Sequence, residues 1–258
     1  MEAWLETAPG WIQKMPASFE WLQSIIWQVY RTFIENDRWK VFYLSGLKVT
    51  FIVTIGSLLL GVIIGLVLAV IRTVNDSYTA KKPPVVVRIL NKIAKIYITV
   101  LRGTPMMVQL LIMYLVIMVP KTDTMTMLCG IITLGMNSGA YVAEIIRGGL
   151  MAVDKGQMEA GRSLGFSYLA SMWHFVIPQA IKSILPALGN EMITLFKDTS
   201  LVSVIALRDI TKQTQNVVSK IYIALVPYIS LAIIYLFFVI IMTKLLEVFE
   251  RRLRKSDH

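Results

Sequence analysis

Groups that carry enzymatic chemistry are scarce in this sequence. It has one cysteine, Cys129, and two histidines, His174 and His258. A single cysteine cannot form an internal disulfide, and neither histidine stands in a metal-binding spacing such as HExxH. The GxSxG nucleophile motif and the GxxxxGK[ST] phosphate-binding loop are also missing. The sequence therefore predicts no catalytic residue, no metal site and no bound cofactor, and it offers no P-loop for hydrolysing ATP.

Charge is scarce too, and unevenly distributed. Only 16% of the 258 residues are charged, with 16 acidic against 26 basic side chains, while 56% are hydrophobic. That apolar fraction exceeds the level of an ordinary soluble domain. The basic residues lie between long apolar runs, where the positive-inside rule accounts for them, so the net charge of +10 does not indicate nucleic-acid binding. The composition predicts an all-α integral membrane protein that contacts the lipid bilayer.

Five apolar stretches are long enough to cross a bilayer, which takes about 20 residues as a helix. They cover approximately residues 44–71, 93–119, 124–146, 174–195 and 221–248. The loop after the first stretch, the segment after the third and the tail at 251–258 are basic, so we expect these regions in the cytoplasm. Five spans then place the N-terminus outside and the C-terminus inside.

Residues 1–43 form an N-terminal extension to the membrane domain at 44–250. The extension holds five of the six tryptophans, and tryptophan prefers the headgroup level of a bilayer. Apolar residues recur in it at helical spacing, with polar residues available for a wet side. These are, on the apolar side, Leu22, Ile25, Ile26, Val29 and Phe33, and on the polar side Gln23, Gln28, Arg31 and Glu35. The pattern predicts an interfacial helix outside the cytoplasm.

Two glycines in the first apolar stretch fall four residues apart, at Gly61 and Gly65. They would share one helix face and let another helix approach closely. The alternative is that glycine is simply frequent in membrane helices.

The second apolar stretch is interrupted by Arg102, Gly103, Thr104 and Pro105. A charge and a helix breaker at membrane depth are costly unless they face protein or water, and transporters build sites at such breaks. Arg102, Thr104 and the nearby Gln109 are therefore candidates for lining a substrate pathway. The alternative is that Arg102 extends to the interface or pairs with a carboxylate of a neighbouring helix.

The fourth stretch carries Asn190 and Glu191, and an intramembrane carboxylate is a functional candidate by default. We expect Glu191 to bind the ammonium group of a substrate or to pair with Arg102. The polar cluster that follows either lines the pathway or forms the cap and turn that end the span. Its members are Lys197, Asp198, Thr199 and Ser200.

Glu144 and Arg147 lie three residues apart near the cytoplasmic end of the third stretch. This spacing predicts a structural ion pair on one helix face. A direct substrate role for Glu144 is the less favoured alternative.

Residues 159–178 form a small polar module within this apolar chain. Glu159, Ala160 and Gly161 open a helical turn with small side chains, and Gly165 is suited to the left-handed conformation that ends a helix. A second helical run then enters the fourth stretch at Pro178. A helix-turn-helix continuous with a span could transmit a partner's movement into the bilayer. An ordinary loop helix is the simpler alternative.

The module resembles the EAA loop of ABC-importer permeases, written EAA, three residues, G, nine residues, I, one residue, LP. Gly161 replaces the last alanine, Phe175 the isoleucine and Ile177 the leucine. The surrounding segments resemble the polar amino acid uptake subfamily, of the histidine, glutamine and arginine type. They are LRGTP from Leu101, AYVAEIIRGGL from Ala140, KGQ from Lys155 and KDTSLVS from Lys197.

The resemblance implies a type I importer permease with five spans that is not itself an enzyme. Glu159, Ala160, Gly161, Gly165 and Pro178 would couple it to a dimer of ABC ATPase subunits, which bind ATP and magnesium; residues 151–178 are called the coupling segment below. A second permease chain, identical or paralogous, and an extracytoplasmic amino acid-binding protein would complete the transporter in a bacterial cytoplasmic membrane. A permease for another small solute is the alternative, and an ion-coupled carrier or channel would have no use for the coupling segment.

Overall fold

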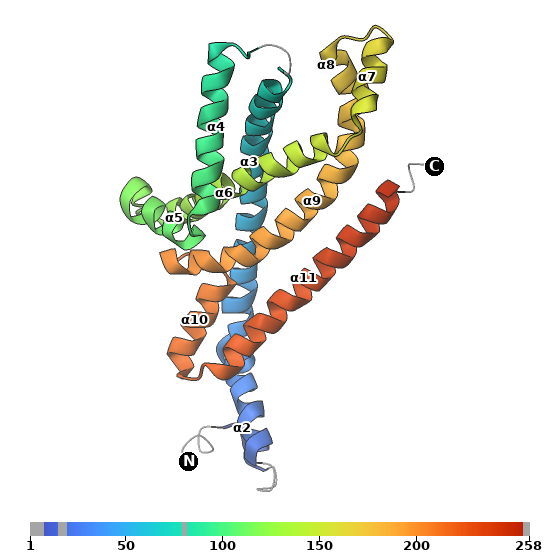
Figure 1. Ribbon diagram of the computed structural model, residues 1–258. Coiled ribbons are helices and arrows are strands. Elements are labelled where there is room, and N and C mark those ends of the chain that lie inside the picture. Colours follow the sequence, from blue (N-terminus) through green and yellow to red (C-terminus); the bar gives the residue numbers. More distant parts are fainter. Residues whose placement is uncertain (1–7, 15–19, 79–81, 255–258) are drawn as a thin grey trace. The chain divides into compact units, whose positions relative to one another are not determined.

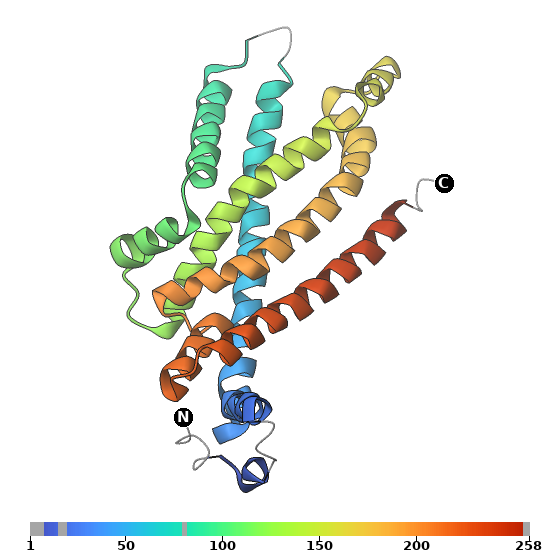
Figure 2. The same cartoon turned by 60° about the horizontal axis from the view of Figure 1, so that its bottom comes forward.

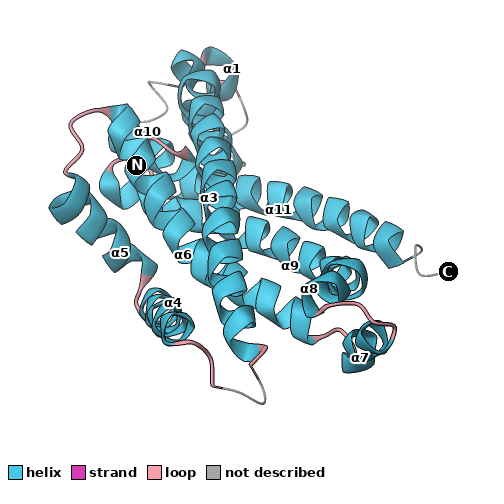
Figure 3. Ribbon diagram, turned by 90° about the horizontal axis from the view of Figure 1, so that it is seen from above, coloured by secondary structure: helices cyan, strands magenta, loops and turns pink. Residues whose placement is uncertain are grey.

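The computed structural model describes residues 8–14, 20–78 and 82–254. Parts of the predicted N-terminal extension, of the basic loop after the first span and of the basic tail, namely 1–7, 15–19, 79–81 and 255–258, lie outside the described residues. Every regular element of the described residues is a helix (Figure 3). The chain divides into two compact units, Met1–Phe51 with Arg208–Phe238, and Ile52–Leu207 with Val239–His258. They are called unit 1 and unit 2.

Unit 2 holds most of the helices. Its α-helices, two of which begin in unit 1, are α3 (Ser45–Asp76), α4 (Val85–Gly103), α5 (Met106–Ile112), α6 (Asp123–Met151), α7 (Lys155–Ser163), α8 (Tyr168–Ser171), α9 (Ile177–Asp198) and α11 (Leu225–Arg254). Its shorter helices are the π-helices η5 (Met113–Met118) and η6 (Met172–Val176) and the 3-10 helix η7 (Thr199–Ile205).

Helix α6 is the centre of unit 2. Helices α4, α5 and α9 all pack against it, and α6 and α9 run side by side in both ribbon views (Figures 1 and 2). Many of its residues are small, so neighbouring helices approach closely; Ala140 and Ala143 are fully buried beside Ile98 of α4. Val142 and Ile146 are buried with Ala69 of α3. The small-residue composition of α6 thus decides which element becomes the core.

The glycine pair predicted in the first span lies at this core. A Cβ added to Gly61 would come 2.8 Å from Ser138 Oγ, and one added to Gly65 would come 2.5 Å from Val142 Cγ1. Both distances are shorter than van der Waals contact, so each glycine is where α3 meets α6. The structure therefore favours the close-contact interpretation over the alternative that glycine is simply frequent in membrane helices.

The predicted break in the second span is present. Helix α4 ends at Gly103, α5 begins at Met106, and the two are bent by 106°. Helix α4 begins at Val85, eight residues before the predicted start, because Pro84 precedes its first residue. Proline stops a helix from extending backward but is compatible with its beginning.

Within the described residues, three helical segments are long and apolar enough to cross a membrane, Trp39–Asp76, Asp123–Met151 and Leu225–Leu253. The bent pair α4 and α5 with η5 makes four if it counts as one span. The predicted fourth span, α9, is not among them, because Lys182 and Glu191 lower its apolar character. The five-span topology and the orientation of the termini remain predictions.

Unit 1 is built from the N-terminal helices and the segment around α10. Its elements are α1 (Gly10–Gln13), α2 (Glu20–Val29), the π-helix η2 (Tyr30–Ile34), the 3-10 turn η3 (Glu35–Asp37), the π-helix η4 (Trp39–Leu44), α10 (Ile210–Ile221) and the beginnings of α3 and α11. Tyr43, Ile210 and Val217 are buried at its core, with Phe33 packed against them.

The predicted amphipathic helix exists, and one residue of its predicted wet side is placed differently. Ile25 and Val29, predicted on the apolar side, are exposed, which agrees with an apolar side that faces lipid. Gln23, predicted on the wet side, is buried, as is Trp27, which lies in a cluster with Ile12. The prediction was wrong for Gln23, because spacing along one helix does not show which face another helix covers. The interfacial position of the helix stays a prediction.

Candidate functional site

A cavity of about 200 Å³ opens between the break in the second span and helices α6 and α9 of unit 2. Its walls combine carboxylate, hydroxyl and amide groups with apolar side chains. The lining residues are Thr104 and Met106 at the break, Leu134, Asn137 and Tyr141 from α6, and Glu191, Thr194, Leu195 and Asp198 from α9. Sites for small solutes are usually apolar with a few convergent polar groups, and this wall is more polar than that, because six of its nine lining residues carry a polar group.

The carboxylate of Glu191 is held by one hydroxyl. Ser138 donates from its Oγ to Glu191 Oε1 at 2.7 Å. Asp198 lines the same cavity two helical turns further along α9. None of the lining residues is a lysine or arginine. The cavity thus presents two carboxylates with no cation in its wall, an arrangement that attracts a positively charged group.

Three of the predicted pathway residues reach this cavity, namely Thr104, Glu191 and Asp198. The others are placed differently. Asn190 points out of the cavity lining and its amide donates to the Pro186 carbonyl at 3.3 Å. Lys197 is exposed on α9.

Two members of the predicted polar cluster serve the fold at this point. Thr199 is fully buried, and its hydroxyl donates to the Phe196 carbonyl at 2.7 Å. Ser200 accepts a hydrogen bond from Ser203 through its backbone carbonyl. The cluster therefore divides between the cavity wall, where Asp198 lies, and the cap and turn at the end of α9.

Gln109 and Asn137 repair the break in the second span. A helix would bond the Leu101 carbonyl to the N–H of residue 105, but proline has none. Instead, Gln109 Nε2 and Asn137 Nδ2 donate to that carbonyl at 2.8 and 2.9 Å. Gln109 also bonds the Thr104 hydroxyl at 2.8 Å, and Asn137 bonds Gln109 Oε1 at 3.0 Å. Gln109, predicted to line the pathway, is not among the lining residues. It instead bonds Thr104, which lines the cavity.

Arg102 is not paired with Glu191. Its guanidinium carbon lies 5.0 Å from the centre of the Tyr141 ring, and no ion pair of the described residues includes it. Tyr141 in turn lines the cavity. Of the two alternatives for Glu191, the pair with Arg102 is not formed among the described residues. Ser138 donates to the carboxylate, while Arg102 lies over an aromatic face, where a cation is attracted to the ring.

The predicted pair of Glu144 and Arg147 is part of a larger group. Arg147 Nη2 lies 3.2 Å from one oxygen of Glu144, and Arg72 of α3 pairs with the other oxygen. All three side chains are partly buried. Glu144 therefore joins α3 to α6, which supports the structural role over a substrate role.

The coupling segment forms a helical hairpin beyond the adjoining ends of α6 and α9, with α7 and α8 side by side (Figures 1 and 2). Helix α7 ends in a Schellman motif, in which Gly165 has φ of +88°. The N–H of Phe166 bonds the Gly161 carbonyl at 3.1 Å, and the N–H of Gly165 bonds the Arg162 carbonyl at 3.0 Å. The turn that the glycine predicted is present.

Gly161 differs from its neighbours in the EAA motif. Glu159 and Ala160 are exposed, whereas Gly161 is buried. A Cβ at Gly161 would lie 2.8 Å from Ser171 Oγ and 2.9 Å from Phe175 Cδ2. The surface that approaches this backbone is thus the chain's own second helix.

Pro178 is in the first turn of α9. Proline is tolerated there, because the backbone N–H groups of a first turn have no hydrogen-bond partner within the helix.

Sequence reasoning missed three residues that take part in the polar contacts described above. Asn137 and Ser138 are adjacent polar residues inside an apolar span, and that position was the signal that could have revealed them. Arg72 carries no comparable signal, because the positive-inside rule already accounts for a basic residue after the first span. Among the described residues, no group of three or more metal-ligating side chains is placed to hold an ion.

Comparison with known proteins gives concordant results. Residues 85–255 match the model of the family described as binding-protein-dependent transport system inner membrane component. The chain is 36% identical to the arginine transport system permease protein of Bacillus subtilis, over 84% of this chain and 94% of that one. It is 32% identical to the glutamine transport system permease protein of Escherichia coli, over 92% and 98%.

Solved structures show the same fold. A crystal structure of an amino acid ABC transporter with histidines is 40% identical, with a TM-score of 0.75 over 85% of this chain and 98% of that chain. A methionine ABC transporter in an inward-facing conformation has a TM-score of 0.66 at 15% identity, over 83% and 97%, which bears on the fold alone. The chain therefore belongs to the inner-membrane-component family of binding-protein-dependent transport systems, the permeases of ABC importers.

Proposed function

We propose that this chain forms the membrane pathway of an ABC importer for polar amino acids, with a preference for those that carry a positive charge. The relatives named for arginine and glutamine support the solute class. The observation that carries the proposal is the connection between the cavity and the coupling segment: α6 and α9 supply most of the cavity wall, and the same two helices continue into the hairpin of α7 and α8.

The cavity chemistry supports the choice of substrate. Glu191 and Asp198 can accept hydrogen bonds from the ammonium group that every amino acid carries, and from a second cationic group. A volume of about 200 Å³ is below the range of about 300–1,000 Å³ typical of drug-sized ligands. A single amino acid is of suitable size.

Energy would come from partner chains. Two ATPase subunits that bind ATP and magnesium would dock on the exposed Glu159 and Ala160 of this chain and of a second permease chain. Closure of the ATPase pair would move the hairpins, and rigid α6 and α9 would carry that movement to the cavity walls. This chain itself is then not an enzyme. A binding protein would deliver the amino acid on the outer side of a bacterial cytoplasmic membrane.

The substrate site is tested by a pair of neighbouring variants. In proteoliposomes containing the complete transporter, Glu191→Gln should lower arginine uptake at least tenfold and glutamine uptake less, because the lost charge faces the second cation of arginine. Asn190→Ala, outside the cavity lining, should retain uptake. Equal uptake by both variants would remove Glu191 from the site.

The coupling role is tested separately, by ATP hydrolysis. Glu159→Arg reverses the charge where a partner docks and should abolish stimulated hydrolysis while the chain still inserts. Lys121→Glu, in the exposed turn before α6, is the control and should leave hydrolysis unchanged. Hydrolysis that persists in Glu159→Arg would show that the ATPase docks elsewhere.

A further inference from the structure

Helix α2 carries an apolar stripe that nothing in unit 1 covers among its described residues. Trp21, Ile25 and Val29 are spaced four apart, and their exposed fractions are 64, 43 and 40%. The opposite face carries the buried Gln23 and Trp27. The helix is thus held to its own unit by one side and presents a row of large apolar side chains on the other.

The exposed apolar surface continues toward the first span. Ile34, Trp39 and Val41 are each about half exposed, and Trp39 begins the apolar helical segment Trp39–Asp76. That segment is long and apolar enough to cross a bilayer, where exposed apolar side chains are stable in contact with lipid. Two of the exposed residues of this surface are tryptophans, which favour the headgroup region.

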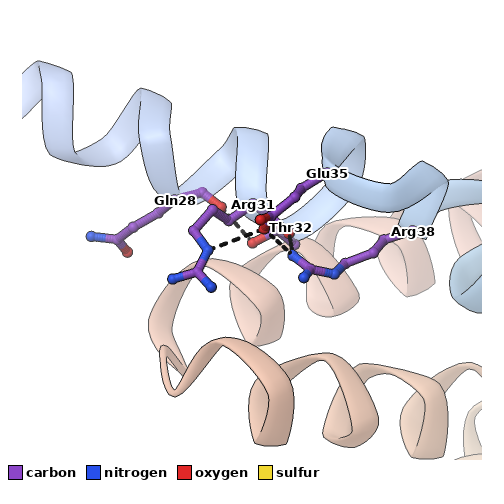
Figure 4. A network of polar contacts seen from close by, with 5 residues as sticks. All are labelled: Gln28, Arg31, Thr32, Glu35 and Arg38. Atoms are coloured by element: carbon purple, nitrogen blue, oxygen red, sulfur yellow. Dashed lines mark hydrogen bonds and ion pairs between the residues drawn. The ribbon is translucent and has the colours of Figure 1, made fainter. Parts of the chain in front are cut away.

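Three charged groups of this segment pair with one another. Figure 4 shows Arg31, Glu35 and Arg38 directed toward one another. Glu35 accepts from Arg31 Nε at 3.1 Å and from Arg38 Nη1 at 2.7 Å, and Arg38 also donates to the Arg31 carbonyl. Only 5% of Arg38 is exposed. Pairing lowers the cost of placing these charges near an apolar phase.

The ionised state of Glu35 fits this arrangement. Burial raises the pKa of Glu35, but the hydrogen bonds and charges of Arg31 and Arg38 outweigh burial and bring that pKa below its ordinary value. Glu35 is therefore anionic at neutral pH and offsets the two arginines. The guanidinium of Arg31 also lies 4.9 Å from the centre of the Trp27 ring, on the buried side of α2.

The same network fixes a bend between α2 and the span. Asn36 and Asp37 have φ of 56° and 52°, in the left-handed region that ends a helix. Arg31 and Glu35 precede the bend, and Arg38 follows it. The ion pairs therefore connect the two sides of the bend and keep α2 from continuing the axis of the helix that follows.

We propose that the stripe of Trp21, Ile25 and Val29 lies in the lipid interface of the leaflet where the first span begins. The network of Arg31, Glu35 and Arg38 holds α2 in that position. The stripe shares Ile25 and Val29 with the predicted apolar side and adds Trp21, whereas Gln23 of the predicted wet side belongs to the interior of unit 1. This inference depends on the chain spanning a membrane and is independent of the substrate.

The test places a fluorescent label on α2 of the complete transporter. In a Cys129→Ala background, bimane is attached at Ile25→Cys and the complex is embedded in nanodiscs of phosphatidylcholine and phosphatidylglycerol. Gln28→Cys, on the flank of the same helix, and Lys121→Cys, in the exposed turn before α6, are the matched controls. Quenching is measured with nitroxide-labelled lipid and with aqueous iodide.

We expect nitroxide lipid to quench the label at position 25 strongly and iodide to quench it weakly, with the reverse order at 121 and an intermediate result at 28. Strong quenching by iodide at 25 would place the stripe in water and overturn the proposal. An effect of added binding protein on the label, without nitroxide quenching, would assign the stripe to a protein partner and overturn the proposal as well.

The network is tested by Glu35→Gln, which leaves two arginines without their carboxylate. Nitroxide quenching at position 25 should then fall, while quenching of a label at Leu59→Cys, exposed on α3, should stay the same. Unchanged quenching at 25 in this variant would show that the ion pairs do not hold α2 at the interface.

Discussion

The two size-changing departures from the EAA spacing contact each other, and this predicts a compensating pair. The family spacing has alanine and isoleucine where this chain has Gly161 and Phe175. A Cβ at Gly161 would lie 2.9 Å from Cδ2 and 3.1 Å from Cε2 of Phe175. The missing methyl group at one position therefore makes the space that the larger ring at the other occupies. Gly161→Ala and Phe175→Ile should each be harmful alone, and together they should be less harmful than their sum, although Ser171 Oγ would still lie 2.8 Å from the added Cβ.

The magnitudes follow from the geometry. Gly161→Ala overfills the hairpin, which costs about 1–3 kcal/mol, while alanine favours the helix by about 1 kcal/mol, leaving a net loss of about 0–2 kcal/mol. Phe175→Ile leaves space and removes an edge-on contact with Phe166, whose ring centre is 5.3 Å away at 90°. That change costs about 1–3 kcal/mol. In the double variant the new methyl groups fill the vacated space, so the loss should be smaller than the sum by about 1–2 kcal/mol.

Thermal unfolding of the purified transporter and hydrogen exchange at residues 166–176 measure this coupling. The matched control replaces the exposed Ala160 by glycine, alone and with Phe175→Ile. That pair should be additive, because residue 160 is exposed. Additivity of the Gly161 and Phe175 pair to within about 0.5 kcal/mol would refute the compensation.

Three further predictions concern stability and topology. Asp209 caps α10 outside the predicted spans, and burial raises its pKa to about 6 although the backbone N–H groups of Lys212 and Thr211 act against it. Because this pKa exceeds the ordinary 3.8, the folded state binds the proton more tightly, and stability should fall by roughly 3 kcal/mol from pH 4 to 6 and level off above. Asp209→Asn keeps the cap and should flatten that profile in melts at each pH; a slope unchanged by the substitution would contradict the assignment. Asn137→Leu removes two hydrogen bonds at the break and should cost about 1–3 kcal/mol by thermal unfolding, and an unchanged melting temperature would show that Gln109 suffices. In a Cys129→Ala background, cysteine at Ala160 should react with an impermeant maleimide only after the membrane is opened, and labelling in intact cells would invert the topology.

Local rules made much of this protein predictable. The helix break at Pro105 follows from a missing N–H, and the turn at Gly165 follows from the freedom of glycine at φ of +88°. The pair of Glu144 and Arg147 follows from a spacing of three on one helix. The long apolar runs predicted an all-helical membrane protein, and the EAA spacing with its flanking segments indicated the permease family before any comparison was made.

The candidate site was predictable only in part. Thr104, Glu191 and Asp198 were candidates because they are polar at membrane depth, and all three line the cavity. The same rule also selected Asn190 and Lys197, which do not. A polar side chain at membrane depth needs a partner or water. Its place in the sequence does not show in which direction around the helix that partner lies.

Contacts between distant segments were decided by the tertiary structure alone. Ser138 and Glu191 are 53 residues apart, and Arg72 and Glu144 are 72 apart, so no spacing rule connects them. The orientation of α2 is of the same kind, since burial of Gln23 depends on which helix packs on that face. A sequence determines helices through interactions within a few residues, whereas the partner of each face depends on how complete helices fill space together.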